Sequence, residues 1–143
     1  MALHAFVAAH AALHDGRDAI GGNAGPIVLH AQYQAGAAAP TALALMRSRY
    51  TAYVRGAIDY LVATHDASTR DTVDVKAVTK WSRQTRWLGL EIVGTERGGA
   101  EDDEGVVEFL ARGSTLGRPF AQRERSRFRR LEGRWYYIDG DVR

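Results

Sequence analysis

The 143-residue sequence has no cysteine, only three prolines and no long hydrophobic run. Without cysteine, neither a disulfide framework nor a thiolate zinc site can form. No apolar stretch approaches the roughly 20 residues of a membrane-spanning helix, so we expect no membrane contact. The formal net charge of +2 is too small to indicate a nucleic-acid partner. The N-terminus lacks the basic head of a signal peptide, and the sequence therefore predicts a cytoplasmic protein.

The composition is that of a globular domain, with 45% hydrophobic and 25% charged residues. The length corresponds to one domain with a sizeable core. Residues 1–40 are rich in alanine and glycine, and several glycines and two prolines in 15–40 are typical of a linker. We expect residues 1–40 to be partly flexible and residues 41–143 to form the compact domain.

The first half of that domain has helical periodicity. Thr41 is a suitable N-cap and Gly56 a suitable stop for a first helix. Apolar residues between them recur at helical spacing and form one stripe: Leu43, Met46, Tyr50, Tyr53 and Val54. A short second helix is predicted over 57–63. A third is predicted from a cap at Asp71 to about Gln84, with Val75, Val78 and Trp81 on one face.

The second half changes to the two-residue period of β-strands. Strands are predicted over 87–93, 105–112, 120–131 and 134–138, separated by glycine-containing turns, the second of them over 113–119. In the first strand Leu88, Leu90 and Ile92 are expected on one side and Trp87 on the other. Helices followed by an antiparallel meander predict an α+β fold, with about three helices packed on a four-stranded sheet.

The third predicted strand carries the strongest pattern. Its odd positions hold four arginines: Arg123, Arg125, Arg127 and Arg129. Four guanidinium groups cannot share a dry core because each would need a partner to offset desolvation. The opposite side, with Phe120 and Phe128 at its ends, must then face inward. Glu124 and Ser126 lie between these phenylalanines, and we expect both to point toward the helices.

An inward carboxylate needs a cation or a proton, and Arg49, beside the first helical stripe, is the expected partner of Glu124. In the fourth strand either Trp135 with Tyr137 or Tyr136 with Ile138 faces inward, and we favour the first pair. Glu108 is compatible with either face of its strand. The candidate ligand-binding residues are Arg49, Tyr50, Tyr53, Glu124, Ser126, Trp135 and Tyr137.

Two interpretations of this cluster stay open. In one, Arg49 and Glu124 form a buried ion pair that holds the first helix to the sheet. In the other, the cluster binds a small polar molecule. Within the second, Glu124 is the candidate general base of an isomerase, cyclase or hydrolase. The arginine face is a third candidate site, for docking RNA or an acidic partner, although we favour a solvated convex face because no aromatic residues are interleaved with the arginines.

Other motifs favour ordinary structural roles. His65-Asp66 fits a turn after the second helix, and Glu101–Glu104 fits a solvated hairpin tip. His10 and His14, four residues apart, fit a surface pair on a helix rather than a metal site. No phosphate-binding loop or dinucleotide fingerprint is present, so we expect no metal and no cofactor. A homodimer is a candidate assembly, because sheets of this kind often pair through an exposed face.

Five segments in a fixed order resemble the YchJ family of bacterial proteins, over roughly residues 36–141. They are Ala39–Arg70, Trp87–Glu91, Val107–Phe109, Glu124–Phe128 and Gly133–Gly140. The resemblance implies a middle domain similar to nuclear transport factor 2 and the SnoaL-type cyclases, a cone of sheet and helices with an open mouth.

The resemblance implies no reaction, because the function of the YchJ family is not established. Family members usually carry cysteine-rich metal-binding segments, similar to the zinc-binding tail of the secretion motor SecA, and this sequence lacks them. We therefore expect a non-catalytic domain that binds a small ligand or another protein, with a Glu124-dependent enzyme as the alternative.

Overall fold

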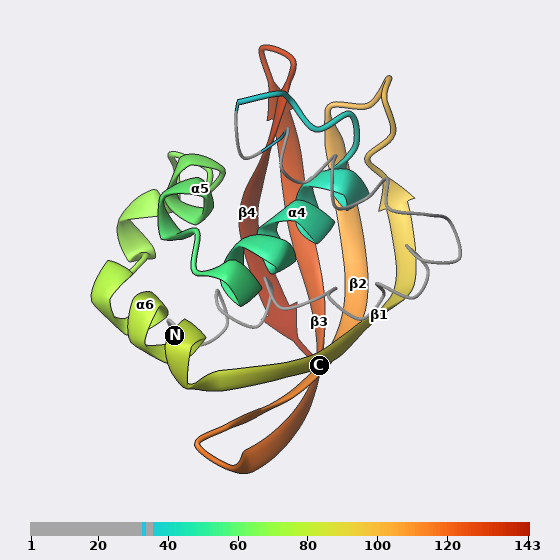
Figure 1. Ribbon diagram of the computed structural model, residues 1–143. Coiled ribbons are helices and arrows are strands. Elements are labelled where there is room, and N and C mark those ends of the chain that lie inside the picture. The colour runs from blue at the N-terminus through green and yellow to red at the C-terminus, as the bar shows by residue number, and fades with distance from the viewer. Residues whose placement is uncertain (1–32, 34–35) are drawn as a thin grey trace.

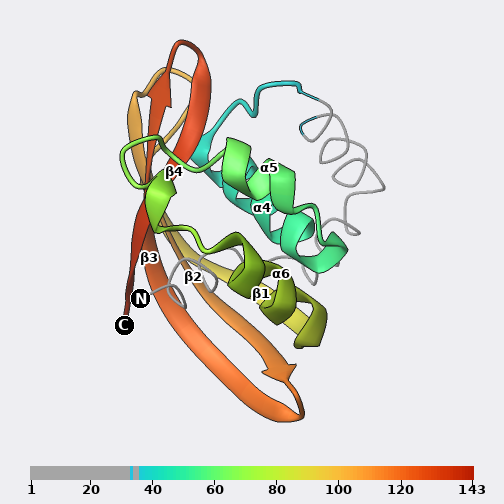
Figure 2. The ribbon, with the colours of Figure 1, turned by 90° about the vertical axis from the view of Figure 1, so that its left-hand side faces the viewer.

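The computed structural model describes Tyr33 and residues 36–143, in which helices precede a four-stranded antiparallel sheet (Figure 1). The strands follow one another in the order β1-β2-β3-β4. The elements are α4 (Ala42–Arg55), α5 (Ile58–Ala63), a 3-10 turn (Arg70–Thr72), α6 (Val75–Gln84), β1 (Thr85–Arg97), β2 (Glu104–Thr115), β3 (Arg118–Leu131) and β4 (Arg134–Val142). Figure 2 shows the three helices on one side of a curved sheet. The predicted α+β class is confirmed.

Helix α4 begins and ends where its capping residues predict. The Thr41 side chain accepts a hydrogen bond of 3.0 Å from the amide of Ala44. Gly56 has a φ of 73°, the left-handed conformation that ends many helices. Met46 and Tyr50 on the predicted stripe are fully buried, and they belong to the core that lies between α4 and the sheet.

Helix α6 begins three residues later than predicted. Asp71 lies in the 3-10 turn, and Asp74 is the cap, accepting a 3.0 Å hydrogen bond from the amide of Ala77. Both aspartates are good capping residues, so local propensity does not choose between them. The later start leaves Val75 49% exposed, while Val78 on the same predicted face is buried.

Strand β1 departs from strict alternation. The pairing with β2 skips Leu88, with Trp87 opposite Gly113 and Gly89 opposite Arg112. This β-bulge places both Trp87 and Leu90 against the core and leaves Leu88 49% exposed. The prediction that Leu88 and Leu90 share one side of the strand, with Trp87 on the other, is therefore wrong, because a single extra residue shifts the alternation.

The sheet is longer than the sequence pattern indicates. Strand β2 continues to Thr115, so that the predicted turn over 113–119 shrinks to Leu116 and Gly117, and the β2–β3 hairpin extends past α6 (Figure 2). The turn predicted at Glu132-Gly133 is present, with φ values of 50° and 79° that match a type I′ hairpin.

Candidate functional site

Strand β3 has the predicted alternation. Glu124 and Ser126 are completely buried, and Phe128 is 1% exposed. The arginines lie on the other face of the strand, and each forms an ion pair with a carboxylate. The pairs are Arg123–Glu108, Arg125–Glu96 with a second contact to Glu108, Arg127–Asp139 and Arg129–Asp66. Glu108 thus belongs to the outer face. Because these charges are neutralised within the protein, the arginine face is a poor docking surface for an acidic partner.

The carboxyl group of Glu124 lies directly against the backbone of β4. A Cβ atom added to Gly140 would stand 2.0 Å from Oε2 of Glu124. Ser126 donates a 3.2 Å hydrogen bond to the same oxygen. The other oxygen, Oε1, is buried and has no hydrogen-bond partner among the residues that the structure describes. Gly140 therefore provides the space that Glu124 occupies.

The expected ion pair between Arg49 and Glu124 is absent from the ion pairs of the described residues. Arg49, itself 2% exposed, donates from Nη1 to the carbonyl of Leu61 at 2.8 Å and to Oγ1 of Thr64 at 2.5 Å. Its guanidinium also lies 4.7 Å from the centre of the Tyr137 ring. The acceptors at the end of α5 and the aromatic face take the role that we expected for Glu124.

Burial decides the protonation of this cluster. It raises the pKa of Glu124 to about 8, against the opposing effect of the Ser126 hydrogen bond, and the charges of Asp141 and Asp139 add to the rise. Burial also raises the pKa of Tyr53 and Tyr137, and Glu124 and Arg49 both influence these two hydroxyls electrostatically. At neutral pH Glu124 is a neutral acid that can donate a hydrogen bond.

All seven candidate residues are buried. Tyr50 and Tyr53 are buried against the aromatic rings of α6 and β1, with Tyr50–Trp87 and Tyr53–Trp81 ring centres 5.9 and 6.3 Å apart. Of the two alternatives for β4, the structure shows Trp135 and Tyr137 buried, at 2% and 1% exposure. Arg49, Glu124, Ser126, Trp135 and Tyr137 lie around the inner faces of β3 and β4.

His65 and Asp66 do more than form a turn. Both are buried, at 2% and 1% exposure. Burial alone would raise the pKa of Asp66, but hydrogen bonds from Arg129 and Ser68 lower it to about 2. The Arg129 contact is bidentate, at 2.6 and 2.9 Å. Asp66 therefore attaches the loop after α5 to the outer side of β3, a role that the sequence analysis missed.

The His65 side chain belongs to the inner cluster. Its ring lies 5.2 Å from that of Tyr137, edge to face, and Nε2 is 3.0 Å from the hydroxyl of Thr69. Burial, with the charges of Arg49 and Arg70, lowers the pKa of His65 to about 4. The backbone of Asp66 donates to the carbonyl of Tyr137 at 2.7 Å, so a short bridge to β4 holds the loop. No feature of the sequence directly indicated this contact between His65 and Tyr137.

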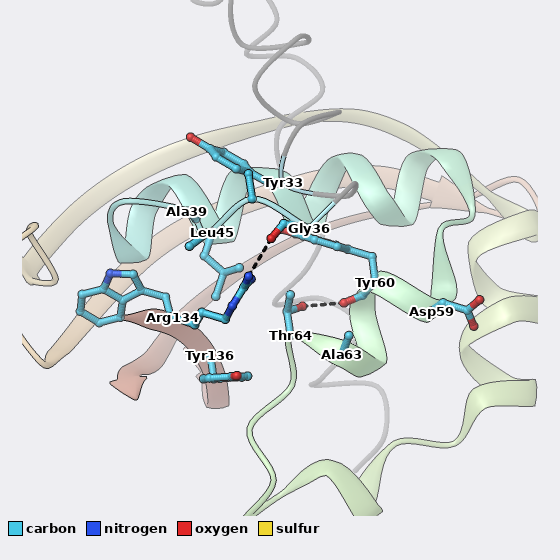
Figure 3. Close-up of a pocket in the computed structure, with 13 residues that line it drawn as sticks. Tyr33, Gly36, Ala39, Leu45, Asp59, Tyr60, Ala63, Thr64, Arg134 and Tyr136 are labelled. Carbon is cyan, nitrogen blue, oxygen red and sulfur yellow. Dashed lines mark hydrogen bonds between the residues drawn. The ribbon is translucent and has the colours of Figure 1, made fainter. Parts of the chain in front are cut away.

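A pocket of about 300 Å³ opens beside this cluster (Figure 3). Its walls come from Tyr33 and 36–39, from α4 and α5, and from the start of β4. The polar lining residues include Asp59, Tyr60, Thr64 and Arg134, and Trp135 is the one predicted site residue that also lines it. Arg134 donates to the carbonyl of Gly36 at 2.8 Å, which joins two walls of the pocket.

The fold and the buried cluster define an α+β domain of the type found in nuclear transport factor 2, and the family model for the middle NTF2-like domain of YchJ matches residues 41–140. The chain belongs to the YchJ middle-domain family, as the sequence motifs predicted.

Two related bacterial proteins share most of this domain with the chain. A UPF0225 protein of Chromobacterium violaceum is 48% identical over 104 residues, covering 73% of this chain and 76% of that protein. A UPF0225 protein of Geobacter sulfurreducens is 44% identical over 103 residues, covering 72% of this chain and 64% of that protein. These names assign no reaction, in agreement with the prediction of a protein of unknown function.

Two solved structures are similar. The solution structure of a SEC-C motif containing protein from Rhodopseudomonas palustris has a TM-score of 0.66 at 38% identity, covering 73% of this chain and 80% of that one. The crystal structure of a SEC-C motif containing protein from Psychrobacter arcticus has a TM-score of 0.62 at 33% identity, covering 72% and 61%.

Two further observations concern only Tyr33 and residues 36–143. No helix in that part of the chain has the length and apolar character needed to cross a bilayer. The same part contains no group of three or more histidine, aspartate or glutamate side chains arranged to hold a metal ion. His10 and His14, the pair considered in the sequence analysis, lie outside the described residues.

Proposed function

We propose that this domain binds a small polar ligand in the pocket of Figure 3 without catalysing a reaction. The observation that carries the proposal is the hydrogen bond between buried Arg49 and Thr64, a residue of the pocket wall. Thr64 lines the pocket, and its hydroxyl accepts a hydrogen bond from the buried guanidinium of Arg49. Through this contact the pocket reaches the cluster of Arg49, Tyr50, Tyr53, Glu124, Ser126, Trp135 and Tyr137.

The pocket has the size and lining of a small-ligand site. Its volume of about 300 Å³ is at the lower end of the range for ligand pockets, which combine apolar walls with a few polar groups. Tyr60 and Trp135 supply aromatic surface, and Asp59 and Arg134 supply one charge of each sign. The indole N–H of Trp135 is buried without a partner among the described residues.

A thermal-shift screen of polar metabolites tests the proposal, with a variant in which the pocket is filled. Ala63 is exposed and lines the pocket, so Ala63→Phe would occupy ligand space without disturbing the core. Ala121→Phe, on an exposed β3 position outside the pocket, is the matched control. We expect at least one compound to stabilise the wild type and the control but to bind Ala63→Phe at least tenfold more weakly. A screen without a stabiliser, or stabilisers indifferent to Ala63→Phe, would refute the proposal.

The second candidate function is an enzyme that uses Glu124 as an acid–base group. The observation that favours it is the raised pKa of about 8 on a buried carboxyl without a cationic partner. A pKa in this range suits proton transfer near neutral pH. For any substrate that the screen identifies, Glu124→Gln should abolish turnover and leave binding in the pocket intact. Full turnover in this variant would exclude the acid–base role.

The proposed cytoplasmic location and homodimer remain predictions. Sedimentation velocity over a hundredfold range of protein concentration tests the dimer, and a constant monomer mass would exclude it. Expression of the full-length protein with fractionation of cytoplasm and membranes tests the location.

A further inference from the structure

A second cavity lies at the opposite end of the sheet from the pocket of Figure 3. It is a groove of about 490 Å³ where the β2–β3 hairpin extends past α6. We call it the hairpin groove, and its lining residues are Trp81, Thr115, Leu116, Arg118, Pro119, Phe120 and Gln122. Leu116 is 73% exposed, the largest exposure of a big apolar residue in the described chain. Arg118, Phe120 and Gln122 share the even-numbered face of β3 with Glu124, so the groove continues the helix-facing side of the sheet.

Several contacts hold the walls of the hairpin groove in place. The rings of Trp81 and Phe120 are 6.2 Å apart. The amide of Leu116 donates to the carbonyl of Gln84 at 3.2 Å, which connects the hairpin turn to the end of α6. Gly113 leaves room for the Phe120 ring, because a Cβ there would lie 2.8 Å from that ring. The groove is therefore formed before any partner arrives.

The two segments that form the hairpin groove carry charge of one sign. Residues 75–90 contain no acidic side chain, and neither do residues 109–123. These two segments contribute the groove walls and carry five exposed basic residues that form no ion pair within the described part of the chain: Lys76, Lys80, Arg83, Arg86 and Arg118. Of the five, Arg118 lines the groove itself. The arginines of the outer β3 face differ, since each of them has a carboxylate partner.

We propose that the hairpin groove docks an acidic peptide segment of a protein partner, with one large apolar side chain of that segment inserted beside Leu116 and Trp81. An apolar anchor flanked by carboxylates matches both observations, an apolar groove with Arg118 on its wall and further unpaired cations on the segments that form it. A nucleic acid fits less well, because only one arginine lies among the groove walls and the two aromatic rings there, Trp81 and Phe120, lie against each other. This proposal concerns a different surface from the ligand pocket and does not depend on it.

A displayed library of random 12-residue peptides tests the inference with the full chain as bait. We expect enriched peptides to contain aspartate or glutamate around an aromatic or aliphatic residue, and their affinity to fall several-fold between 50 and 300 mM salt. Leu116→Asn should weaken these peptides at least tenfold. Asparagine tolerates the φ of 51° at this position, so the turn is retained. Arg118→Glu should weaken them to a similar degree.

Two matched controls separate the groove from general effects. Leu131→Asn removes another exposed leucine, 45% exposed at the other end of β3, and Arg55→Glu reverses another exposed, unpaired charge. Both should leave peptide affinity unchanged. The inference is overturned if no acidic peptides are enriched, if Leu116→Asn binds them as well as Leu131→Asn does, or if single-stranded RNA binds the groove more tightly than the peptides. Self-association that Leu116→Asn abolishes would also overturn it, since the occupant would then be a second copy.

Discussion

Glu124 and Asp66 are two buried carboxyl groups with opposite protonation. Their exposures are 0% and 1%. Asp66 receives a bidentate contact from Arg129 on the outer side of β3, and its pKa lies at about 2. Glu124, on the inner side of the same strand, has a hydroxyl partner but no cation, and its pKa lies at about 8. Burial raises the pKa of both carboxyl groups, and only at Asp66 do hydrogen bonds from Arg129 and Ser68 together outweigh it.

The two carboxyl groups accordingly have different effects on the fold. The Asp66–Arg129 pair is directional and holds a loop in place. Neutral Glu124 fills space made by Gly140 and leaves a donor available in the interior. The inner face of β3 is thus suited to binding chemistry, and the outer face is suited to structural ion pairs.

The largest expected effect concerns the space around Glu124. Gly140→Ala would place a methyl group 2.0 Å from a carboxyl oxygen enclosed by the core, and we expect a loss of about 3 kcal/mol in the free energy of unfolding. Urea unfolding monitored by circular dichroism measures it. Gly94→Ala, in an exposed strand position where an added Cβ meets nothing within 4 Å, should change stability by less than about 0.5 kcal/mol. In a Glu124→Ala background, the additional Gly140→Ala change should cost less than it does in the wild type, because the carboxyl that it would contact is gone. An equal cost in both backgrounds would show that the clash is elsewhere.

The next effect is the pH dependence that Glu124 confers. Its carboxyl titrates near 4.5 when unfolded and near 8 when folded, so the folded state holds one more proton between these values. The stabilisation is complete below pH 4.5 and is lost as the pH rises toward 8. His65 has a pKa of about 4 when folded and 6.5 when unfolded, so its unfolded state loses a proton around pH 6.5 and adds a smaller opposite slope at the start of this window. We therefore expect the wild type to lose about 1 kcal/mol per pH unit on average between pH 6.5 and 8.

Glu124→Gln removes this titration while keeping the shape of the protonated acid. Its unfolding free energy should be nearly independent of pH over the same window and close to the wild-type value at pH 6. Chemical unfolding at half-unit intervals of pH makes the measurement. A flat wild-type profile would mean that Glu124 is ionised in the folded protein, and it would remove the basis of the comparison with Asp66.

A smaller effect is expected at the paired carboxylate. Asp66→Asn should cost about 2 kcal/mol, less than a fully buried pair, because the Arg129 side chain is 38% exposed and water can solvate it. The depressed pKa means that the stabilisation is present above pH 3.8 and lost as the pH falls toward 2. Asp139→Asn breaks the exposed pair with Arg127 and should cost less than about 1 kcal/mol. Equal losses in the two variants would show that burial of Asp66 adds nothing.

Much of this architecture could be predicted from local pattern. The caps Thr41 and Gly56, the α+β order of elements and the two faces of β3 all follow from side-chain type and spacing. The errors occurred where two local solutions compete. Asp71 and Asp74 are equally good caps, and the one local sign of the bulge at Leu88 is the adjacent Gly89, since an isolated glycine in a strand often marks a bulge.

The alternation of side chains along β3 was enough to predict that Glu124 and Ser126 are buried and that the four arginines are not. Successive side chains of a pleated strand point to opposite faces, whatever surrounds the strand. The partner of each charge was decided only by folding. The end of α5 supplies acceptors for Arg49, the loop after α5 brings Asp66 to Arg129, and Gly140 faces the Glu124 carboxyl. These contacts join residues from 12 to 63 positions apart. The longer ones depend on the packing of whole elements, which no local spacing specifies.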